Sequence, residues 1–462
     1  MRKKIKDILI EETVDYEITI QGWVRSFRNN QFIALNDGST NQNLQIVIES
    51  QNYDKELLGH ITTGAAFEAK GKIVLSQGKG QRVEMIAEQL TLLGVSNPEK
   101  YPLQLRNRPS LEYLREHAHL RFRTNVFAAI SRVRHHLAFA VHEFFHKRGF
   151  LYLNTPIITS SDAEGAGEMF HVTTLDFDNI PKTEDGKVNF KEDFFGAATN
   201  LTVSGQLQAE LAAMALGSVY TFGPTFRAEN SNTVRHLAEF WMIEPEVAFN
   251  DLKDNIDLAE SFIKYIIQYA LTHCEEDLKF LADRQAQEDK QKPQADRQEM
   301  SLIEKLEFVI NNEFERITYT EAIDILLESR PHKRKQFKFD VSWGIDLHSE
   351  HERYLVERHF KKPVIVTDYP KDIKAFYMRM NDDGKTVAAM DILAPGIGEI
   401  VGGSQREERL DFLIKRMEEM KVSQNGMQWY LDSRRFGTAP HAGFGLGFER
   451  LVLFVTGMTN IR

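Results

Sequence analysis

Between Tyr16 and about Leu93 the chain alternates apolar and polar residues with a period of two, and this pattern constrains its fold more than any other feature. Such alternation predicts β-strands that bury one face. Turn-forming residues separate the apolar runs, notably at residues 36–39 (NDGS) and 78–80 (GKG). The runs themselves are Ile18 to Ile20, Phe32 to Leu35, Leu44 to Ile48, Ala65 to Val74 and Val83 to Ala87. Five short strands in so short a stretch favour a small barrel over residues 1–95, with the five-stranded OB-fold as the leading candidate.

Residues 96–120 read as a linker, because they lack periodicity and carry three prolines before Ser110. Beyond them, apolar residues at helical spacing predict helices over 121–148 and over 252–274. Strand-like runs return after residue 335 among glycine-rich turns. Since strands and helices do not alternate regularly, we expect a mixed α+β domain over 121–462. A helical, polar insert is expected around 275–335, with its most charged part at 283–299.

Composition narrows the class of protein. Of 462 residues, 42% are hydrophobic and 27% are charged, and no apolar run approaches the ~18 residues of a membrane span. The net charge of −10 requires any nucleic-acid site to be a local basic patch. The single cysteine, Cys274, excludes an internal disulfide and is expected to be a small buried group. Acidic residues interrupt the basic start before any signal-like core forms, so we expect a cytoplasmic protein without a membrane partner.

One short motif points to zinc but lacks the context for it. Residues His142 to His146 (HEFFH) match the H-E-x-x-H pattern of zinc proteases. Gly149 and Pro156 prevent a long helical return that would carry a third ligand. We therefore expect an ordinary helix in which Phe144 and Phe145 pack inward.

Two segments combine arginine with aromatic or glycine residues. In residues 226–240 (FRAENSNTVRHLAEF), strand-like ends flank a polar loop, which predicts a hairpin with Arg227 near Phe240. An arginine and an aromatic ring on adjacent strands can grip a phosphate and stack on a base. Residues 443–451 (GFGLGFERL) are expected to form a glycine-rich strand that runs into an apolar helix carrying Arg450.

Two further segments supply polar groups. Residues 391–406 (DILAPGIGEIVGGSQR) place Asp391 and Glu399 on either side of a Pro-Gly turn. Such hard oxygen ligands suit Mg²⁺ that bridges nucleotide phosphates. In residues 201–207 (LTVSGQL), small polar side chains end a strand.

Taken in their order along the chain, these segments resemble the class II aminoacyl-tRNA synthetases, including motifs two and three of that family. The helix at 121–148 and the strand around Pro156 resemble motif one, the dimer-forming element. Together with the N-terminal barrel, the match covers nearly the whole chain and resembles the aspartyl/asparaginyl/lysyl subgroup. The resemblance implies an OB-fold anticodon-binding domain followed by an α+β catalytic domain, an antiparallel β-sheet flanked by helices. It also implies a homodimer, a tRNA partner, and ATP with Mg²⁺.

The resemblance assigns an ATP-binding set: Arg227, Glu229, His236, Phe240, Glu399 and Arg450. The catalytic residues would be Arg227, on the α-phosphate and the amino-acid carboxylate, and Arg450, on the γ-phosphate of a bent ATP. Phe240 would stack on adenine, His236 would approach the γ-phosphate, and Glu229 would contact the adenine end. These groups would stabilise charge on the α-phosphorus and the leaving pyrophosphate, while the substrate's own carboxylate is the nucleophile.

The remaining assignments concern the metal and the substrate amino acid. Asp391 and Glu399 match the magnesium-ligand positions. Ser204 and Gln206 would hold the α-ammonium group, and Arg406 would meet the side-chain oxygen. Arg406 would also repel lysine.

Two positions separate asparagine from aspartate as the substrate. Aspartyl enzymes carry a lysine where this chain has Ala209, and an aspartate where it has Glu244. A lost cation and an added acceptor for an amide NH₂ both favour asparagine. The expected activity is therefore ATP-dependent ligation of L-asparagine to tRNA(Asn) through an asparaginyl-adenylate, with release of AMP and diphosphate. The alternative is an aspartyl enzyme, possibly a non-discriminating one.

Two more groups of residues match the subgroup. Residues 161–168 (SDAEGAGE) resemble its mobile loop, which places Glu164 at the bound amino acid; an ordinary turn is the alternative. In the barrel, Arg28, Phe32 and Gln45 match positions that read the central anticodon base, a uridine. For Phe32 the alternative is a place in the barrel core.

Two classes of protein that do not charge tRNA are the alternatives to this interpretation. Asparagine synthetase A shares the catalytic fold but lacks the barrel that is expected here. A synthetase-like paralogue that only binds nucleotide or RNA would have lost a motif arginine or a metal carboxylate, and none is missing.

Overall fold

The computed structural model describes residues 2–78, 80–103, 109–161, 169–230, 233–294 and 297–462. The chain divides into two compact units, one of residues 1–135 with 274–293 and one of residues 136–273 with 294–462. The boundary falls inside helix α4 (Asn125–Lys147). Within the ranges given, no helix combines the length and the apolar character needed to cross a membrane.

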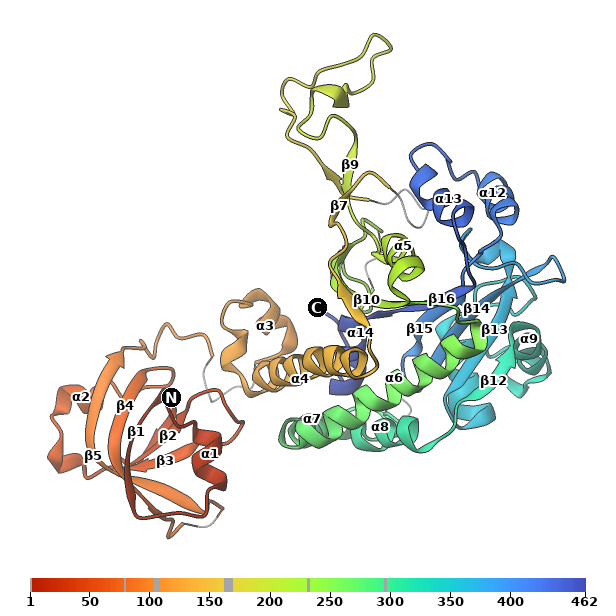
Figure 1. Cartoon of the computed structure of the whole chain (residues 1–462). Coiled ribbons are helices and arrows are strands. Elements are labelled where there is room, and N and C mark those ends of the chain that lie inside the picture. Colours follow the sequence, from red (N-terminus) through yellow and green to blue (C-terminus); the bar gives the residue numbers. More distant parts are fainter. Residues whose placement is uncertain (1, 79, 104–108, 162–168, 231–232, 295–296) are drawn as a thin grey trace. The chain divides into compact units, whose positions relative to one another are not determined.

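In the first unit the alternating region forms a closed five-stranded barrel, as predicted (Figure 1). Its strands, joined in the order β1-β2-β3-β5-β4, are β1 (Tyr16–Arg28), β2 (Phe32–Asn36), β3 (Leu44–Val47), β4 (Ala66–Leu75) and β5 (Val83–Gly94). The alternation places Ile33 and Leu35 in the core, whereas Phe32 and Ala34 stay partly exposed. Helix α1 (Ile5–Ile10) adds Ile5 and Ile8 to this core, and α2 (Lys55–Gly59) follows β3.

The expected linker is partly structured. Ser110 caps a short helix, α3 (Leu111–Glu116), by accepting a hydrogen bond from the Tyr113 amide at 3.1 Å. Leu114 of this helix packs in a small apolar cluster with Leu103 and Phe127. The predicted helix at 121–148 is α4, which begins at Asn125 because residues 121–123 form a 3₁₀ turn.

The second unit contains the predicted sheet with flanking helices. Eight strands lie in the order β12-β13-β14-β15-β16-β11-β10-β6, and the parallel pairs of this sheet within the described residues are the outermost two, β12 with β13 and β10 with β6. They are β6 (Leu151–Leu153), β10 (Ser218–Phe226), β11 (Glu239–Ala248), β12 (Glu315–Thr318), β13 (Val364–Pro370), β14 (Thr386–Ala394), β15 (Gly398–Gln405) and β16 (His441–Gly447). A small sheet holds β7 (Ile158–Thr159), β9 (Thr199–Leu201) and β8 (His171–Val172).

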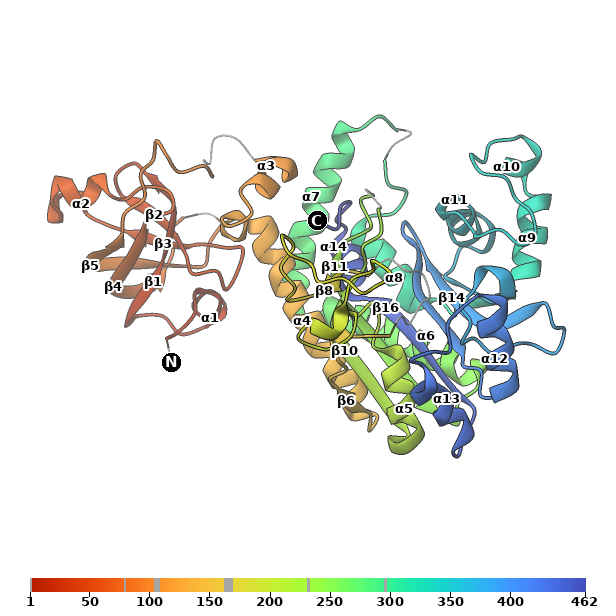
Figure 2. The ribbon, with the colours of Figure 1, turned by 90° about the horizontal axis from the view of Figure 1, so that it is seen from above.

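Helices cover the large sheet. Helix α5 (Gln206–Leu216) packs on β10 and β11, and α6 (Leu252–His273) packs on β14, β15 and β16 (Figure 1). Helices α12 (Leu410–Glu419) and α13 (Gln428–Arg435) lie side by side in both views (Figure 1, Figure 2). Shorter helices of this unit include α10 (Arg330–Lys333), α11 (Ser349–Arg353) and α14 (Phe448–Thr456).

The region expected to be a polar insert is mixed. Helix α7 (Glu275–Gln291) is the charged part, and Cys274 at its N-cap position is buried, as predicted. Helices α8 (Leu302–Asn311) and α9 (Tyr319–Glu328) begin with capping boxes and bury apolar faces, and β12 joins the main sheet. Buried groups such as Leu306 and Ile323 make these later elements part of the domain core.

Candidate active site

A cavity of about 360 Å³ lies over the central strands of the large sheet. Most of the residues predicted for ATP, metal and amino acid line it together. These are Ser204, Gln206, Arg227, Glu229, His236, Phe240, Glu244, Asp391, Glu399, Arg406 and Arg450. Glu164 lies outside the described residues, as does the rest of 162–168.

The hairpin of β10 and β11 supplies the first wall of the cavity. The strands are antiparallel, with Thr225 opposite Phe240, and the Arg227 amide donates to the Ala238 carbonyl at 3.0 Å. The Arg227 guanidinium carbon lies 5.4 Å from the centre of the Phe240 ring. The predicted neighbourhood of a cation and an aromatic ring is therefore present.

The hairpin loop contributes one cation that the sequence analysis missed. Arg235 lines the cavity beside His236, and its Nη1 donates to the Ile397 carbonyl at 2.8 Å and to Ser349 Oγ at 3.1 Å. Its neighbour His236 pairs through Nδ1 with the Thr233 hydroxyl. Burial lowers the pKa of Arg235 from its usual value. The arginine-histidine pair in the motif could have indicated this residue.

Two carboxylates face each other on β14 and β15. A Cβ atom on Gly402 would lie 3.1 Å from Glu399 Oε1 and 3.4 Å from Asp391 Oδ1, so the glycine leaves the space between them open. Burial, reinforced by the charge of Asp391, raises the pKa of Glu399. Lys374, another residue that the sequence analysis missed, donates to Asp391 Oδ2 at 2.7 Å.

The two carboxylates fit a divalent cation that takes its other ligands from phosphate and water. Burial, together with the nearby charge of Glu399, also raises the pKa of Glu352, to about 8. No group of three or more histidine, cysteine or acidic side chains forms a metal cage within the described ranges. Two protein carboxylates with open positions are the usual arrangement for Mg²⁺ at a nucleotide.

Arg450 lies on the helix that follows the glycine-rich strand, as the sequence predicts. It lies in the first turn of α14, and its Nη1 donates to the Glu399 carbonyl at 3.2 Å. Next to it, Glu449 accepts a hydrogen bond from the Trp241 amide at 2.8 Å. These contacts tie α14 to both β15 and the β10–β11 hairpin.

The deep end of the cavity is a buried polar pocket around Glu244. Its Oε2 accepts hydrogen bonds from the Gly205 amide at 3.0 Å and from the Thr221 hydroxyl at 2.9 Å, while Ser204 Oγ donates to Oε1. Only 4% of Glu244 is exposed. A carboxylate has about four acceptor positions, so one remains for a substrate donor.

Arg406 faces the same pocket with its orientation fixed. Its Nε donates to Glu246 Oε2 at 3.2 Å and its Nη2 donates to the other oxygen, while Nη1 donates to Ser404 Oγ at 2.9 Å. Sequence reasoning missed Glu246, which lies behind the pocket. The pair of opposite charges leaves Arg406 less able to attract a further anion.

Gln206 is oriented by a second buried network. Its Nε2 donates to Glu210 Oε1 at 3.0 Å, which leaves the amide oxygen for a donor in the cavity. Glu210 also accepts from Arg434 at 2.6 Å and from the Tyr430 hydroxyl at 2.7 Å. Burial alone would raise the pKa of Glu210, but Arg434 and His441 hold it below its usual value.

The H-E-x-x-H segment is an ordinary part of the core, as expected. Phe144 and Phe145 are fully buried, and His142 Nδ1 is 2.8 Å from the Tyr220 hydroxyl. Glu143 accepts a hydrogen bond from the Tyr265 hydroxyl at 2.9 Å and forms an ion pair with Lys147.

In the first unit, the three residues matched to anticodon reading share one outer face of the barrel. Arg28 is opposite Phe32, and Gln45 is opposite Ala34, which lies two residues along the strand from Phe32. Phe32 is not part of the barrel core cluster. Gln45 Nε2 donates to Glu84 Oε2 at 3.0 Å, so the side-chain oxygen is the acceptor that the half-buried amide can offer to a ligand.

Comparisons with known proteins cover the whole chain. A model of class II tRNA synthetases (D, K and N) matches residues 110–462, and a model of OB-fold nucleic acid binding domains matches residues 18–93. The asparagine–tRNA ligases of Cytophaga hutchinsonii and Porphyromonas gingivalis are 58% and 57% identical, over all of this chain and 97% and 96% of theirs. The crystal structure of asparaginyl-tRNA synthetase from Pyrococcus horikoshii complexed with asparaginyl-adenylate aligns over all of this chain and 96% of that one, with 30% identity and a TM-score of 0.82. The chain therefore belongs to the class II tRNA synthetases of the D, K and N group.

Proposed function

We propose that this protein joins L-asparagine to tRNA(Asn) with ATP, through an asparaginyl-adenylate, and releases AMP and diphosphate. The observation that carries the choice of asparagine is the anchored Glu244 carboxylate beside the compensated Arg406 in one buried pocket. Relatives at 56–58% identity named as asparagine–tRNA ligases support the same choice over the aspartyl alternative.

In the pocket, the side-chain amide of asparagine has complementary partners. Arg406 would donate to its oxygen, and the remaining acceptor position of Glu244 would take its NH₂. The oxygen of Gln206 and the hydroxyl of Ser204 would hold the α-ammonium group. An aspartate carboxylate would face Glu244 with like charge, and the Glu246 pairing would weaken its attraction to Arg406.

The first chemical step is attack by the asparagine carboxylate on the α-phosphorus of ATP. A carboxylate oxygen bonds to phosphorus while the bond to the leaving diphosphate breaks. Arg227 would hold both reactants, Phe240 would stack on adenine with Glu229 at its edge, and His236 and Arg450 would hold the γ-phosphate. Fixed cations act here by stabilising charge that develops in the transition state.

Asp391 and Glu399 would hold Mg²⁺, which neutralises phosphate charge when it is bound. The open space at Gly402 and the raised pKa of Glu399 support this placement.

The barrel would bind the anticodon of the tRNA. Phe32 would stack on the central uridine, while Gln45 would accept a hydrogen bond from its N3–H and Arg28 would donate to an oxygen. The shared outer face of these residues supports this assignment.

We also infer a homodimer that is located in the cytoplasm. Large apolar side chains are exposed on and beside α4 and the edge strand β6: Phe139, Leu151, Tyr152, Ile157 and Ile158. Exposed apolar side chains that gather into a patch mark protein interfaces, and these residues belong to the segment that resembles motif one.

Charging assays test the proposal. Purified protein with ATP and Mg²⁺ is expected to load asparagine onto a tRNA(Asn) transcript and to leave a tRNA(Asp) transcript uncharged. Efficient loading of aspartate onto either transcript would favour the aspartyl alternative instead.

A further inference from the structure

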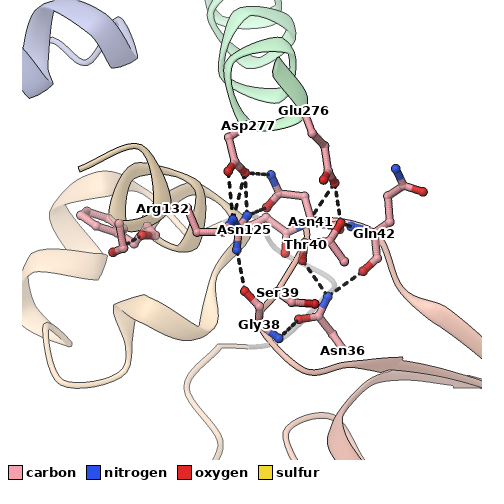
Figure 3. A network of polar contacts seen from close by, with 12 residues as sticks. Asn36, Gly38, Ser39, Thr40, Asn41, Gln42, Asn125, Arg132, Glu276 and Asp277 are labelled. Atoms are coloured by element: carbon pink, nitrogen blue, oxygen red, sulfur yellow. Dashed lines mark hydrogen bonds and ion pairs between the residues drawn. The ribbon is translucent and has the colours of Figure 1, made fainter. Parts of the chain in front are cut away.

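Helix α7, which the proposed chemistry does not use, contacts the barrel through its first turn. Glu276 Oε1 accepts from the Thr40 hydroxyl at 2.6 Å and from the Asn41 amide at 3.1 Å (Figure 3). Asp277 Oδ1 accepts from Asn41 Nδ2 at 2.8 Å. Thr40 and Asn41 belong to the loop between β2 and β3, the strands that carry Phe32 and Gln45.

Arg132 of α4 joins the same network. Its Nε and Nη2 donate to Asp277 at 2.9 and 2.6 Å, and Nη2 also donates to Asn41 Oδ1 at 2.9 Å. Its Nη1 donates to the Gly38 carbonyl at 2.8 Å (Figure 3). The planar guanidinium thus contacts a carboxylate on α7 and two groups of the barrel loop, a geometry that lysine cannot reproduce.

The loop itself is internally braced. Asn36 Nδ2 donates to the carbonyls of Thr40 and Gln42 at 3.0 and 2.7 Å, and its Oδ1 accepts from the Gly38 amide at 2.9 Å (Figure 3). Asn36 is only 1% exposed and Thr40 only 4%. Because these hydrogen bonds hold the loop in one conformation, contacts that fix the loop also fix the ends of β2 and β3.

The two carboxylates of the network lie at a helix terminus that favours negative charge. Glu276 and Asp277 lie in the first turn of a long helix, where the partial positive charge of the helix terminus stabilises carboxylates. The side chain of Asp277 is 10% exposed and that of Arg132 is 21% exposed, so solvent screens this pair only in part. All these residues belong to the first unit, whose boundary with the second falls inside α4.

We propose that Arg132, Glu276 and Asp277 are positioning residues that fix the anticodon-reading strands β2 and β3 to helices α4 and α7. We name these three residues the loop clamp. The inference rests on the proposed anticodon role of the barrel. The clamp serves the tRNA-dependent step and is dispensable for formation of the adenylate, whose residues all lie in the second unit.

The test compares three full-length variants. Asp277→Asn removes the negative charge and keeps the shape of the side chain. Arg132→Lys keeps the positive charge and removes the planar guanidinium group with its several donors. Glu275→Gln is the matched control, because Glu275 is an exposed carboxylate in the same first turn with no contact to the barrel loop among the described residues. We expect Asp277→Asn and Arg132→Lys to raise the KM for tRNA(Asn) about tenfold, or about 1.4 kcal/mol. We expect asparagine-dependent ATP–pyrophosphate exchange to stay within about twofold of the control.

Two outcomes overturn the inference. One is that both clamp variants match Glu275→Gln in charging, and the other is that exchange falls as much as charging does. Phe32→Ala separates this inference from the proposed function: if that variant also leaves the KM for tRNA unchanged, the anticodon assignment itself is wrong. Should Asp277→Asn fail to fold, Thr40→Val removes one contact to Glu276 and carries the same two expectations.

Discussion

Thr221 and Glu244 face each other across the β10–β11 pair, and the threonine hydroxyl donates to Glu244 Oε2 at 2.9 Å. With the Gly205 amide on the same oxygen, this contact presents the other carboxylate oxygen toward Ser204 and the cavity. Glu244 is thus held in one orientation before any ligand binds, as a selective acceptor has to be.

Glu244→Gln is expected to weaken asparagine binding. A glutamine has one acceptor oxygen, so in either orientation its NH₂ group faces a donor of the protein or of the substrate and a hydrogen bond is lost. The loss of binding free energy should be about 1.5–3 kcal/mol, or roughly tenfold or more in affinity. Aspartate should be rejected less strongly, because the repelling charge is gone. Exchange kinetics at varied asparagine, aspartate and ATP measure all three effects. An equal loss for ATP would instead make Glu244 a residue that only braces the hairpin.

Phe240→Leu is expected to raise the KM for ATP. Base–aromatic stacking contributes about 1–3 kcal/mol per base, so the increase should be about tenfold, with little change for asparagine. Phe436→Leu, at an exposed ring outside the cavity, is the control. If the two variants behave alike, adenine does not stack on Phe240.

The position of Phe240 beside Arg227 could be predicted because hairpin strands and a polar loop are local patterns. The barrel was predictable for a similar reason, since its alternation follows directly from one buried face. The hydrogen-bond and ion-pair partners of the predicted residues could not be predicted from the sequence. Arg434 lies more than two hundred positions from Glu210, and Glu276 is as far from Thr40, so only the folded chain brings each pair together.

The sequence alone also does not show whether a charged residue is solvated at the surface or forms specific contacts. Helix α7 falls in the region expected to be a polar insert, yet two of its carboxylates contact the barrel loop. Glu246 is fully buried against Arg406, and no local signal distinguishes it from the many surface glutamates. The role of such a residue depends on which strands become neighbours in the folded sheet.

Leu151→Asp is expected to weaken a dimer. Leu151 lies on the edge strand β6 and is 50% exposed, so a charge there would be desolvated at an interface. Light scattering at micromolar concentration should show a dimer for the unmodified protein and a shift toward monomer for the variant. Leu75→Asp, on the barrel, should leave the mass unchanged. A fully active monomer of the unmodified protein would contradict the dimer.

Cys274 is expected to react slowly with thiol reagents in the folded protein. Burial raises the pKa of its thiol to about 12, so at pH 8 only about one molecule in ten thousand carries the reactive thiolate. Labelling should therefore speed up about tenfold per pH unit between pH 8 and 11. Because the folded state favours the protonated thiol, the stability due to this group is full below pH 9 and declines above it. Fast labelling of the native protein at pH 8 would show that the cysteine is not enclosed.

The most direct test of the account is amino-acid-dependent ATP–pyrophosphate exchange by the purified protein, with asparagine and aspartate compared at equal concentrations. It needs no tRNA and therefore reports only on the cavity that contains Glu244 and Arg406. Rapid exchange is expected with asparagine and little with aspartate. Preferential exchange with aspartate would contradict the substrate assignment.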